Sequence, residues 1–515
     1  MAKLRSMQFN TLINIISSVG VLAVNIIVSF FLSPYIISTI GVEANGFVTL
    51  ANNFITYVDI IVMALNAMAA RFISIAYIQK DYEKANLYYN SVFWGNLIID
   101  AVFLIPALVF VINLDSFINV PAEILFDVKI LFAIVFFSFF VKTGFPNWDC
   151  GTYITNRLDR TYVPNIVLAL FRVIFLIGLF LFFTPHVWYI GLTSCLVSLA
   201  GLAISGYNTH ILTPELKIRF KHPVYSKRVI KELVGSGIWS SIANVGNLLF
   251  SGLDLLICNI FLGPTLMGIL SLSKILINII VQLGESVRGA VGPELTIGYA
   301  KGDKDAMLSS IKRTMKMTSA FLPIPVGVVI VMSDLFYGLW VPSQNAKLLW
   351  ILTVLGIFNR VFNSGIVVLY NVYSVVNKVR INAIIMLISG FISIAVTVGL
   401  MQFTDYDIYV VAGVSSIVTI IKEYVFTVPI TTSLLGYKWY KFYPQLLVSM
   451  ISTFIVIGVG LGVRNLVCVN SWMTFFFDVA IIAIVSFIIN TIVVLKKDER
   501  KMLLKKVRNK IPFLH

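Results

Sequence analysis

Long apolar segments follow one another along almost the whole chain, and short polar stretches separate them. A membrane-spanning helix needs about 20 mostly apolar residues, and on that criterion the pattern predicts about fourteen such helices. Their expected ranges are 11–33, 47–70, 88–112, 122–141, 163–184, 187–209, 233–259, 265–288, 317–337, 346–371, 380–402, 408–434, 443–466 and 474–495. The chain is therefore expected to be an all-α polytopic protein that crosses a membrane many times.

The second half of the chain repeats the first. Residues 40–81 recur without a gap 222 positions later, at 262–303. The matched pairs include Gly41 with Gly263, Gly46 with Gly268, Leu50 with Leu272 and Tyr77 with Tyr299. The offset spans an even number of predicted helices, so both copies should cross the membrane in the same direction. We expect two parallel six-helix lobes followed by a final helix pair.

The boundaries of the expected parts follow from this repeat and from the polar stretches. These parts are an N-terminal lobe at 1–210, a basic cytoplasmic linker at 211–232, a C-terminal lobe at 233–435, an extra helix pair at 436–495 and a basic cytoplasmic tail at 496–515. Two similar lobes in a membrane protein commonly enclose a substrate site at their interface. That interface is where we expect the functional site.

The charged residues indicate the orientation of the chain. Only 12% of the residues are charged, 58% are hydrophobic, and the net charge is +15. Most of the 39 Lys and Arg residues fall on one side of the predicted topology, and short cytoplasmic loops carry such an excess. Both termini should therefore be cytoplasmic. The basic linker and tail should contact anionic lipid headgroups, and no nucleic-acid partner is expected.

Polar side chains recur at spacings of three and four on several predicted helices, so they share one face of each helix. The residues that we expect to line a cavity are Asn25, Asn52, Thr56, Asn244, Asn247, Ser251, Asn278 and Gln282. A polar face turned toward lipid would lose its hydrogen bonds to water. The stripes therefore predict a water-filled cavity between the lobes. Hydrogen bonding between neighbouring helices is the alternative for any single Ser or Asn.

Four cations fall near the middle of predicted helices, namely Lys274, Arg360, Arg172 and Lys422. Each costs at least about 2.5 kcal/mol at the membrane centre unless it is paired or hydrated. No acid lies three or four residues from the first three, and Glu423 is adjacent to Lys422 and so points to a different helix face. Two interpretations stay open: an acid partner on another helix, or a site for an anionic pyrophosphate group.

The energy source is expected to be an ion gradient, the membrane potential or consumption of the substrate. The chain has no G-x-x-x-x-G-K-[ST] loop, which is the usual phosphate-cradling element of ATP-hydrolysing transporters. Asp59 and Asp100 lie within predicted helices of the first lobe. They are candidates for binding a coupling H⁺ or Na⁺.

Enzyme chemistry is not expected. The four histidines and four cysteines are scattered without the spacing of metal ligands, so we predict neither a metal nor a cofactor. The predicted loops on the outer side are too short for an extracytoplasmic catalytic domain. This pattern argues against a membrane-embedded polymerase or glycosyltransferase.

The segment from Ser33 to Gly46 carries a family resemblance. It contains Pro34, then Ile40-Gly41 and Gly46, and Leu262-Gly263 with Gly268 is its counterpart in the second copy. Together with the predicted helix arrangement, this motif resembles the bacterial O-antigen and capsular repeat-unit flippases of the multidrug/oligosaccharidyl-lipid/polysaccharide superfamily, which is MATE-like. The resemblance covers essentially the whole chain and indicates the fold more firmly than the substrate.

The resemblance implies translocation of an undecaprenyl-pyrophosphate-linked oligosaccharide across the bacterial cytoplasmic (inner) membrane by alternating access. The pyrophosphate would meet the four cations and the sugars would meet the polar stripes. Membrane lipids, a polysaccharide polymerase and a chain-length regulator are candidate partners. A flippase for lipid II or a teichoic-acid precursor is an alternative that differs in cargo. A cation-coupled multidrug antiporter is the alternative from another functional group.

Overall fold

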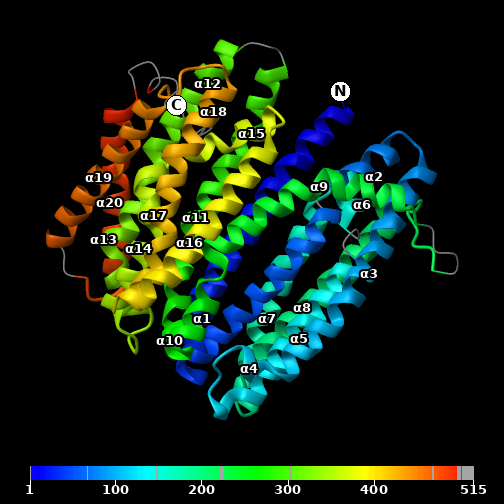
Figure 1. The fold of residues 1–515 in the computed structure, drawn as a ribbon, viewed down its shortest axis with the longest axis horizontal. Helices are drawn as coiled ribbons and strands as arrows, with labels where there is room; N and C mark the ends of the chain where they lie inside the picture. The colour runs from blue at the N-terminus through cyan, green and yellow to red at the C-terminus, as the bar shows by residue number, and fades with distance from the viewer. Residues whose placement is uncertain are drawn as a thin grey trace. The chain divides into compact units, whose positions relative to one another are not determined.

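The computed structural model of the chain is helical, with no strand among the residues that it describes (Figure 1). The described residues are 2–66, 68–145, 149–220, 225–300, 304–466, 469–495 and Arg500. Apart from Arg500, the predicted basic tail at 496–515 lies outside them, as do residues 221–224 of the predicted linker. The helices group into two compact units.

The first unit contains the chain up to Val245 together with Leu255–Gly268. Its helices are α1 (Ala2–Asn66), α2 (Ala69–Ile78), α3 (Tyr82–Ile112), α4 (Leu114–Phe117), η1 (Ala122–Ile124), α5 (Leu125–Gly144), α6 (Cys150–Ile154), α7 (Asp159–Phe182), α8 (Trp188–Leu212) and most of α9 (Lys227–Asn247). Helices α3, α5, α8 and α7 run side by side, with α1 against α7 (Figure 1). Most of α10 (Asp254–Leu262) and the start of α11 (Pro264–Ala300) also belong to this unit.

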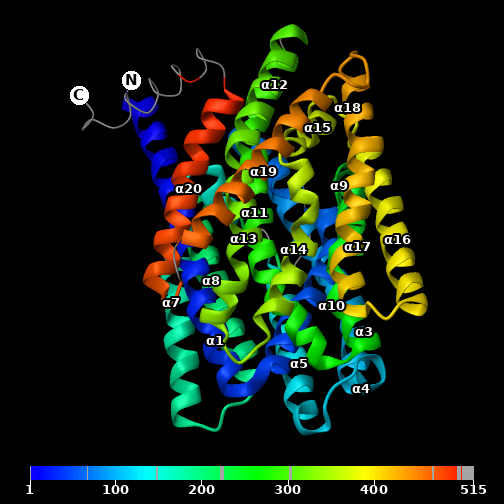
Figure 2. The ribbon, with the colours of Figure 1, turned by 90° about the vertical axis from the view of Figure 1, so that its left-hand side faces the viewer.

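The second unit contains Gly246–Asp254 and the chain from Ile269 onward. Its further elements are the π-helix η3 (Leu248–Gly252), α12 (Lys304–Phe321), α13 (Pro323–Trp340), α14 (Ala346–Asn363), η4 (Ile366–Val368), α15 (Tyr370–Val375), α16 (Val379–Phe403), α17 (Asp407–Lys422), the π-helix η5 (Glu423–Thr427), α18 (Val428–Leu434), α19 (Tyr443–Leu466) and α20 (Trp472–Val494). Helix α14 packs between α13 and α17, and α16 packs on α17. Helices α13, α19 and α20 pack against one another, and α12 packs on α19 and α20 (Figure 2).

The number of membrane spans agrees with the sequence pattern. Thirteen helical stretches of the described chain are long and apolar enough to cross a membrane. The first of them covers 56 residues, and α1 within it has a non-helical kink at Gly41. This stretch corresponds to two predicted spans, 11–33 and 47–70, so the thirteen stretches account for all the predicted helices. The predicted all-α multi-pass fold is confirmed.

One predicted helix is shorter than expected. The apolar run at 346–371 was expected to form a single helix, but α14 ends at Asn363 and the chain continues through η4 into α15. The break places Asn363 and Tyr370 on different segments, where both side chains hydrogen-bond to Glu423. A long-range polar contact therefore competes with the local preference for one continuous helix.

The repeated glycines have structural reasons. Gly41 has φ of 87° and Gly263 has φ of 90°, a region that residues with a Cβ rarely adopt. Gly46 and Gly268 lie against each other within the first unit, because a Cβ built on Gly46 would be 2.9 Å from the Cα of Gly268. A Cβ on Gly268 would be 2.5 Å from the carbonyl oxygen of Val42. The duplicated motif thus supplies both a chain bend and a close backbone contact.

A second contact holds the segment Leu255–Gly268 to the rest of the first unit. The Asn119 backbone N–H donates to Asn259 Oδ1 at 2.8 Å, and Asn259 Nδ2 donates to the Asn119 carbonyl at 2.9 Å. Asn119 Nδ2 also donates to the Asn259 carbonyl at 2.9 Å. Asn259 is fully buried, so these bonds satisfy polar groups that could not otherwise reach water.

The last helix pair is tied to the second unit by an ion pair. Arg464 of α19 donates to both carboxylate oxygens of Asp334 in α13, at 2.9 and 2.6 Å, and to the Val331 carbonyl at 2.7 Å. Fork-shaped contacts of this kind are among the strongest side-chain hydrogen bonds. Asp478 of α20 is fully buried, and neither of its oxygens has a hydrogen-bond partner in the described part of the chain.

Candidate functional site

Lys274 has a carboxylate partner on a neighbouring helix. It lies in α11, and its Nζ is 2.8 Å from Oδ2 of Asp254 at the start of α10. Both side chains are 16% exposed. The two residues are too far apart in sequence for a same-helix spacing test to pair them. The charge of Lys274 is therefore offset by a carboxylate.

Lys422 belongs to a buried hydrogen-bond network in the second unit. Lys422 and Glu423 are 4% and 3% exposed. The Lys422 ammonium donates to Tyr370 Oη at 2.8 Å, and the Tyr370 hydroxyl donates to Glu423 Oε1, also at 2.8 Å. Asn363 Nδ2 donates to the other oxygen of Glu423 at 2.6 Å. The two opposite charges are therefore joined through a tyrosine.

The other groups around Lys422 are a thioether sulfur and two aromatic rings. Its Nζ lies 3.2 Å from the sulfur of Met386, 5.4 Å from the centre of the Phe250 ring and 5.2 Å from that of Tyr370. Aromatic faces attract a cation through the negative charge density of the ring. These contacts offset part of the cost of burying the ammonium.

Arg360 lies beside this network, one helical turn before Asn363 in α14. Its charge acts on both Lys422 and Tyr370. It also lies near α11, because a methyl group added at Gly284 would be 3.8 Å from Arg360 Nη1. Within the described ranges no carboxylate is at ion-pair distance from Arg360.

Arg172 lies in α7 of the first unit. Its Nε is buried and has no hydrogen-bond partner among the described residues. No carboxylate of the described chain lies at ion-pair distance from it either. The four predicted cations thus form two groups. Lys274 and Lys422 have polar partners, whereas Arg172 and Arg360 retain charge that an anion could neutralise.

The two predicted coupling acids lie near the end of α5. Asp100 in α3 is 7% exposed, and its Oδ1 accepts a hydrogen bond from Thr143 Oγ1 at 2.9 Å. Its other oxygen is buried and has no partner among the described side chains and backbone. Asp59 in α1 is exposed. Lys142, which precedes Thr143 in α5, interacts electrostatically with Asp59. Asp100 is thus the more enclosed of the two acids.

The predicted cavity-lining residues are mostly exposed within their own units. The exposed ones are Asn25, Asn52, Thr56, Asn247, Asn278 and Gln282. Asn244 is half-buried and donates to the sulfur of Met63 at 3.1 Å and to the Ser240 carbonyl at 2.9 Å. The Ser251 side chain lies outside the described residues. Exposed amides on apolar helices need water or a polar ligand, so a cavity-lining role stays a prediction.

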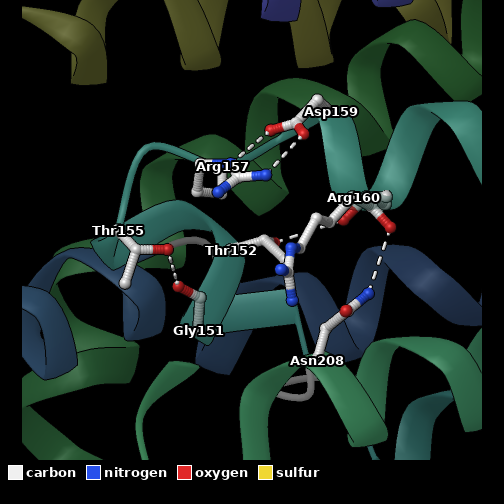
Figure 3. A network of polar contacts seen from close by, with 8 residues as sticks. Gly151, Thr152, Thr155, Arg157, Asp159, Arg160 and Asn208 are labelled. Carbon is white, nitrogen blue, oxygen red and sulfur yellow. Dashed lines mark hydrogen bonds and ion pairs between the residues drawn. The ribbon is translucent and has the colours of Figure 1, made fainter. Parts of the chain in front are cut away.

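A further polar network lies around α6 in the first unit (Figure 3). Arg157 donates to both oxygens of Asp159 at 3.0 Å, and these hydrogen bonds raise the pKa of Arg157. Asn208 of α8 donates to the Arg160 carbonyl at 3.0 Å. Burial raises the pKa of the nearby Cys150 thiol to about 12. Sequence reasoning singled out none of these residues, and their contacts indicate that they fix the loop between α5 and α7.

Sequence reasoning also missed the roles of Asn363 and Tyr370. It considered Glu423 as a buried acid next to Lys422 but related it to no residue on another helix, because a spacing test compares residues of one helix. Both missed residues come from the region where the expected helix is interrupted. An amide and a tyrosine in an otherwise apolar run were the available signal, but nothing in the sequence relates them to a residue about sixty positions away.

These helices and their packing define a multi-pass membrane protein with a MATE-like fold. A structure of the lipid II flippase MurJ, in an inward closed conformation, is similar with a TM-score of 0.65 and 15% sequence identity, over 93% of this chain and 98% of that one. An inward-facing multidrug resistance MATE family transporter of the MOP superfamily matches with a TM-score of 0.61 and 11% identity, over 80% and 95%. At these identities the likeness establishes the fold.

Residues 11–293 match the polysaccharide biosynthesis protein family, and this chain belongs to that family. A relative in Bacillus subtilis (strain 168), the uncharacterized membrane protein EpsK, is 26% identical over 499 residues, which cover 96% of this chain and 98% of the relative. The predicted membership of the MATE-like polysaccharide flippase superfamily is thus confirmed. The two structural neighbours are a flippase and a transporter.

Proposed function

We propose that the protein flips an undecaprenyl-pyrophosphate-linked oligosaccharide repeat unit from the cytoplasmic to the outer leaflet of the bacterial cytoplasmic membrane. The cargo would serve the synthesis of a surface polysaccharide such as O-antigen, capsule or exopolysaccharide. Membership of the polysaccharide biosynthesis family and the fold shared with a lipid II flippase support this class of cargo. Translocation would proceed by alternating access. A polysaccharide polymerase and a chain-length regulator would be partners.

The observation that carries the proposal is the unpaired charge of Arg360. A guanidinium without a carboxylate, beside a buried polar network, can bind a phosphate with two parallel hydrogen bonds. Arg172 provides a second such group in the first unit. Lys274 and Lys422 would contribute attraction at longer range, because each already has a partner. The exposed amides would hydrogen-bond to sugar hydroxyls.

The orientation belongs to the same proposal. With both termini cytoplasmic, most of the basic loop residues would face anionic headgroups of the inner leaflet. The basic groups of the second unit's extra helix pair would then include Arg464 on the outer side, where Asp334 neutralises it. This orientation lets the pyrophosphate enter from the leaflet in which lipid-linked precursors are assembled.

The test is complementation of a deletion strain with wild type, Arg360→Ala, Arg360→Lys or Arg172→Ala at matched membrane levels. Lys129→Ala is the control, because Lys129 has an exposed partner, Asp115. We expect wild type and the control to restore surface polysaccharide. Arg360→Ala should lose about tenfold or more in export, as expected for removal of a charge-assisted hydrogen bond worth about 1.5–3 kcal/mol. Lipid-linked repeat units should accumulate on the cytoplasmic side.

Normal polysaccharide in the deletion strain, together with increased sensitivity to ethidium, would contradict the proposal. That result would favour the multidrug antiporter, whose fold is shared. Normal surface polysaccharide with arrested cell-wall synthesis would instead point to lipid II or a teichoic-acid precursor as the cargo. The cargo class is therefore separable by which product disappears.

A further inference from the structure

The network around Glu423 can hold a proton that moves. An ammonium has only donors, so Lys422 must donate to Tyr370, and the single hydroxyl proton of Tyr370 must then point to Glu423. Both steps of this chain are 2.8 Å long between heavy atoms. A proton can therefore pass from the ammonium to the carboxylate through the hydroxyl without displacement of a side chain.

The network suits a proton better than a metal cation. One Glu423 oxygen accepts from Asn363 Nδ2 and the other accepts from Tyr370, so both oxygens face donors. A sodium ion would need several free oxygens, and it would lie beside the positive charges of Lys422 and Arg360. A proton needs a single lone pair of the carboxylate.

The other titratable groups near Glu423 are two cations and several tyrosines, among them the buried Tyr373 of α15. Lys422 comes from α17, Arg360 from α14 and Tyr370 from α15, while Tyr424 is adjacent on η5 and donates to the Phe362 carbonyl. Helix α16 and the segment η3 contribute Met386 and Phe250 to the same cluster, and these side chains do not titrate. Among the described residues, Glu423 is the only carboxylate that takes part in the hydrogen bonds of this cluster.

Both π-helical segments of the described residues contribute to this cluster. Glu423 is the first residue of η5, and Phe250 lies within η3. π-helical turns are rare and occur frequently at functional sites. The backbone at Gly246 lies tightly against α16, since a Cβ there would be 2.6 Å from the carbonyl carbon of Met386. The cluster around Glu423 therefore includes residues of two π-helical segments, and Met386, which also belongs to it, lies in a tight backbone contact with Gly246.

We propose that Glu423 is the residue at which a proton couples to movement of the anionic cargo, with Tyr370 and Lys422 as its relay. This inference rests on the proposed flippase function. Arg360 supplies the link, because it lies one helical turn before Asn363, whose side chain donates to Glu423. An anion bound at Arg360 would favour the protonated form of the network, and by reciprocity protonation would strengthen anion binding. The coupling group would then lie in the second unit, not at Asp59 or Asp100.

The first measurement is infrared difference spectroscopy of the purified full-length protein during acidification. We expect a C=O stretching band of a protonated carboxyl group in wild type and in Asp100→Asn, and loss of that band in Glu423→Gln. Glutamine keeps an oxygen for the Tyr370 hydroxyl, and its amide nitrogen can donate to Asn363 Oδ1 once the Asn363 amide turns over, so the variant should fold. A band that persists in Glu423→Gln but disappears in Asp100→Asn would overturn the assignment and favour Asp100.

The second measurement is polysaccharide export in cells at matched membrane levels, as external pH is varied. Export by wild type and Asp100→Asn should change severalfold over two pH units, whereas Glu423→Gln should be slow and insensitive to pH. Tyr370→Phe should keep the infrared band but lose most export, because the relay is cut. Export by Glu423→Gln that still follows pH would overturn the coupling. A wild type that restores no polysaccharide would instead contradict the proposed function itself.

Discussion

Substitution of Gly268 by alanine should destabilise the first unit through one short contact. Gly268 lies against Val42 and Gly46, where the added methyl group would be 2.5 Å from a carbonyl oxygen. Ordinary contacts of a Cβ begin near 3.4 Å, so the backbones must separate by up to about 0.9 Å. The neighbour that must move is a backbone atom, which cannot rotate away as the end of a side chain can.

The cost follows from the packing of the contact. Overpacking of a tight contact by one methyl group typically costs about 1–3 kcal/mol. For a unit of this size, 1 kcal/mol corresponds to roughly 2–4 °C in the unfolding temperature, so the expected loss is roughly 2–12 °C. Gly263→Ala should also destabilise, for a different reason: its added Cβ meets nothing within 4 Å, but its φ of 90° is strained for alanine.

The assay is thermal unfolding of the detergent-purified protein, followed by tryptophan fluorescence. Gly178→Ala in α7 is the matched control, because its added methyl group also meets nothing within 4 Å and its backbone is helical. Alanine favours a helix over glycine by up to about 1 kcal/mol, so this control should unfold at the same or a slightly higher temperature. Equal unfolding temperatures for Gly268→Ala and Gly178→Ala would refute the steric reasoning.

Three other substitutions or labels test separate features. Asp478→Leu should raise the unfolding temperature, because a buried polar group without a partner costs about 1–3 kcal/mol. A lower unfolding temperature would mean that the Asp478 carboxyl group makes a stabilising interaction. Cys150 should resist maleimide at pH 7 until the protein is denatured, because its pKa of about 12 and its burial leave little accessible thiolate, and mass spectrometry would detect early labelling. Asn259→Ala should lower the free energy of unfolding by about 1–3 kcal/mol, because it leaves the backbone N–H and carbonyl of Asn119 without these partners; an unchanged free energy would show that the two bonds contribute nothing.

The duplicated motif allowed much of the fold to be predicted. Periodicity and length give the spans, and the glycines at matched positions indicate equivalent bends in both copies. Gly41 and Gly263 indeed have nearly the same positive φ. The contact of Gly46 with Gly268 was not predictable, because a repeat relates the two positions by symmetry and carries no information about their separation. Likewise, the sequence shows no reason why Leu255–Gly268 should pack with the first unit.

The charges were located from the sequence, but their partners were not. A buried cation is conspicuous in an apolar helix, so Lys274, Lys422, Arg360 and Arg172 could be singled out. Asp254 reaches Lys274 from another helix, and Tyr370 reaches Lys422 from an interrupted one. Such partners are set by tertiary packing. Only the three-dimensional structure shows them. It separates the cations that already have a partner from those that do not.

The ion pair between Arg464 and Asp334 limits how the protein can be shortened. Since α19 and α20 cover α13, a chain ending after α18 would bare Asp334 and the buried Ser333 to lipid. An unpaired charge costs about 2.5 kcal/mol or more at the membrane centre and less toward the outer side, where this pair would lie. A minimal twelve-span version would therefore need an apolar residue at 334 before it could be inserted stably. The last two helices are in this sense a permanent lining of the second unit, because Asp334 of α13 depends on α19 for its partner.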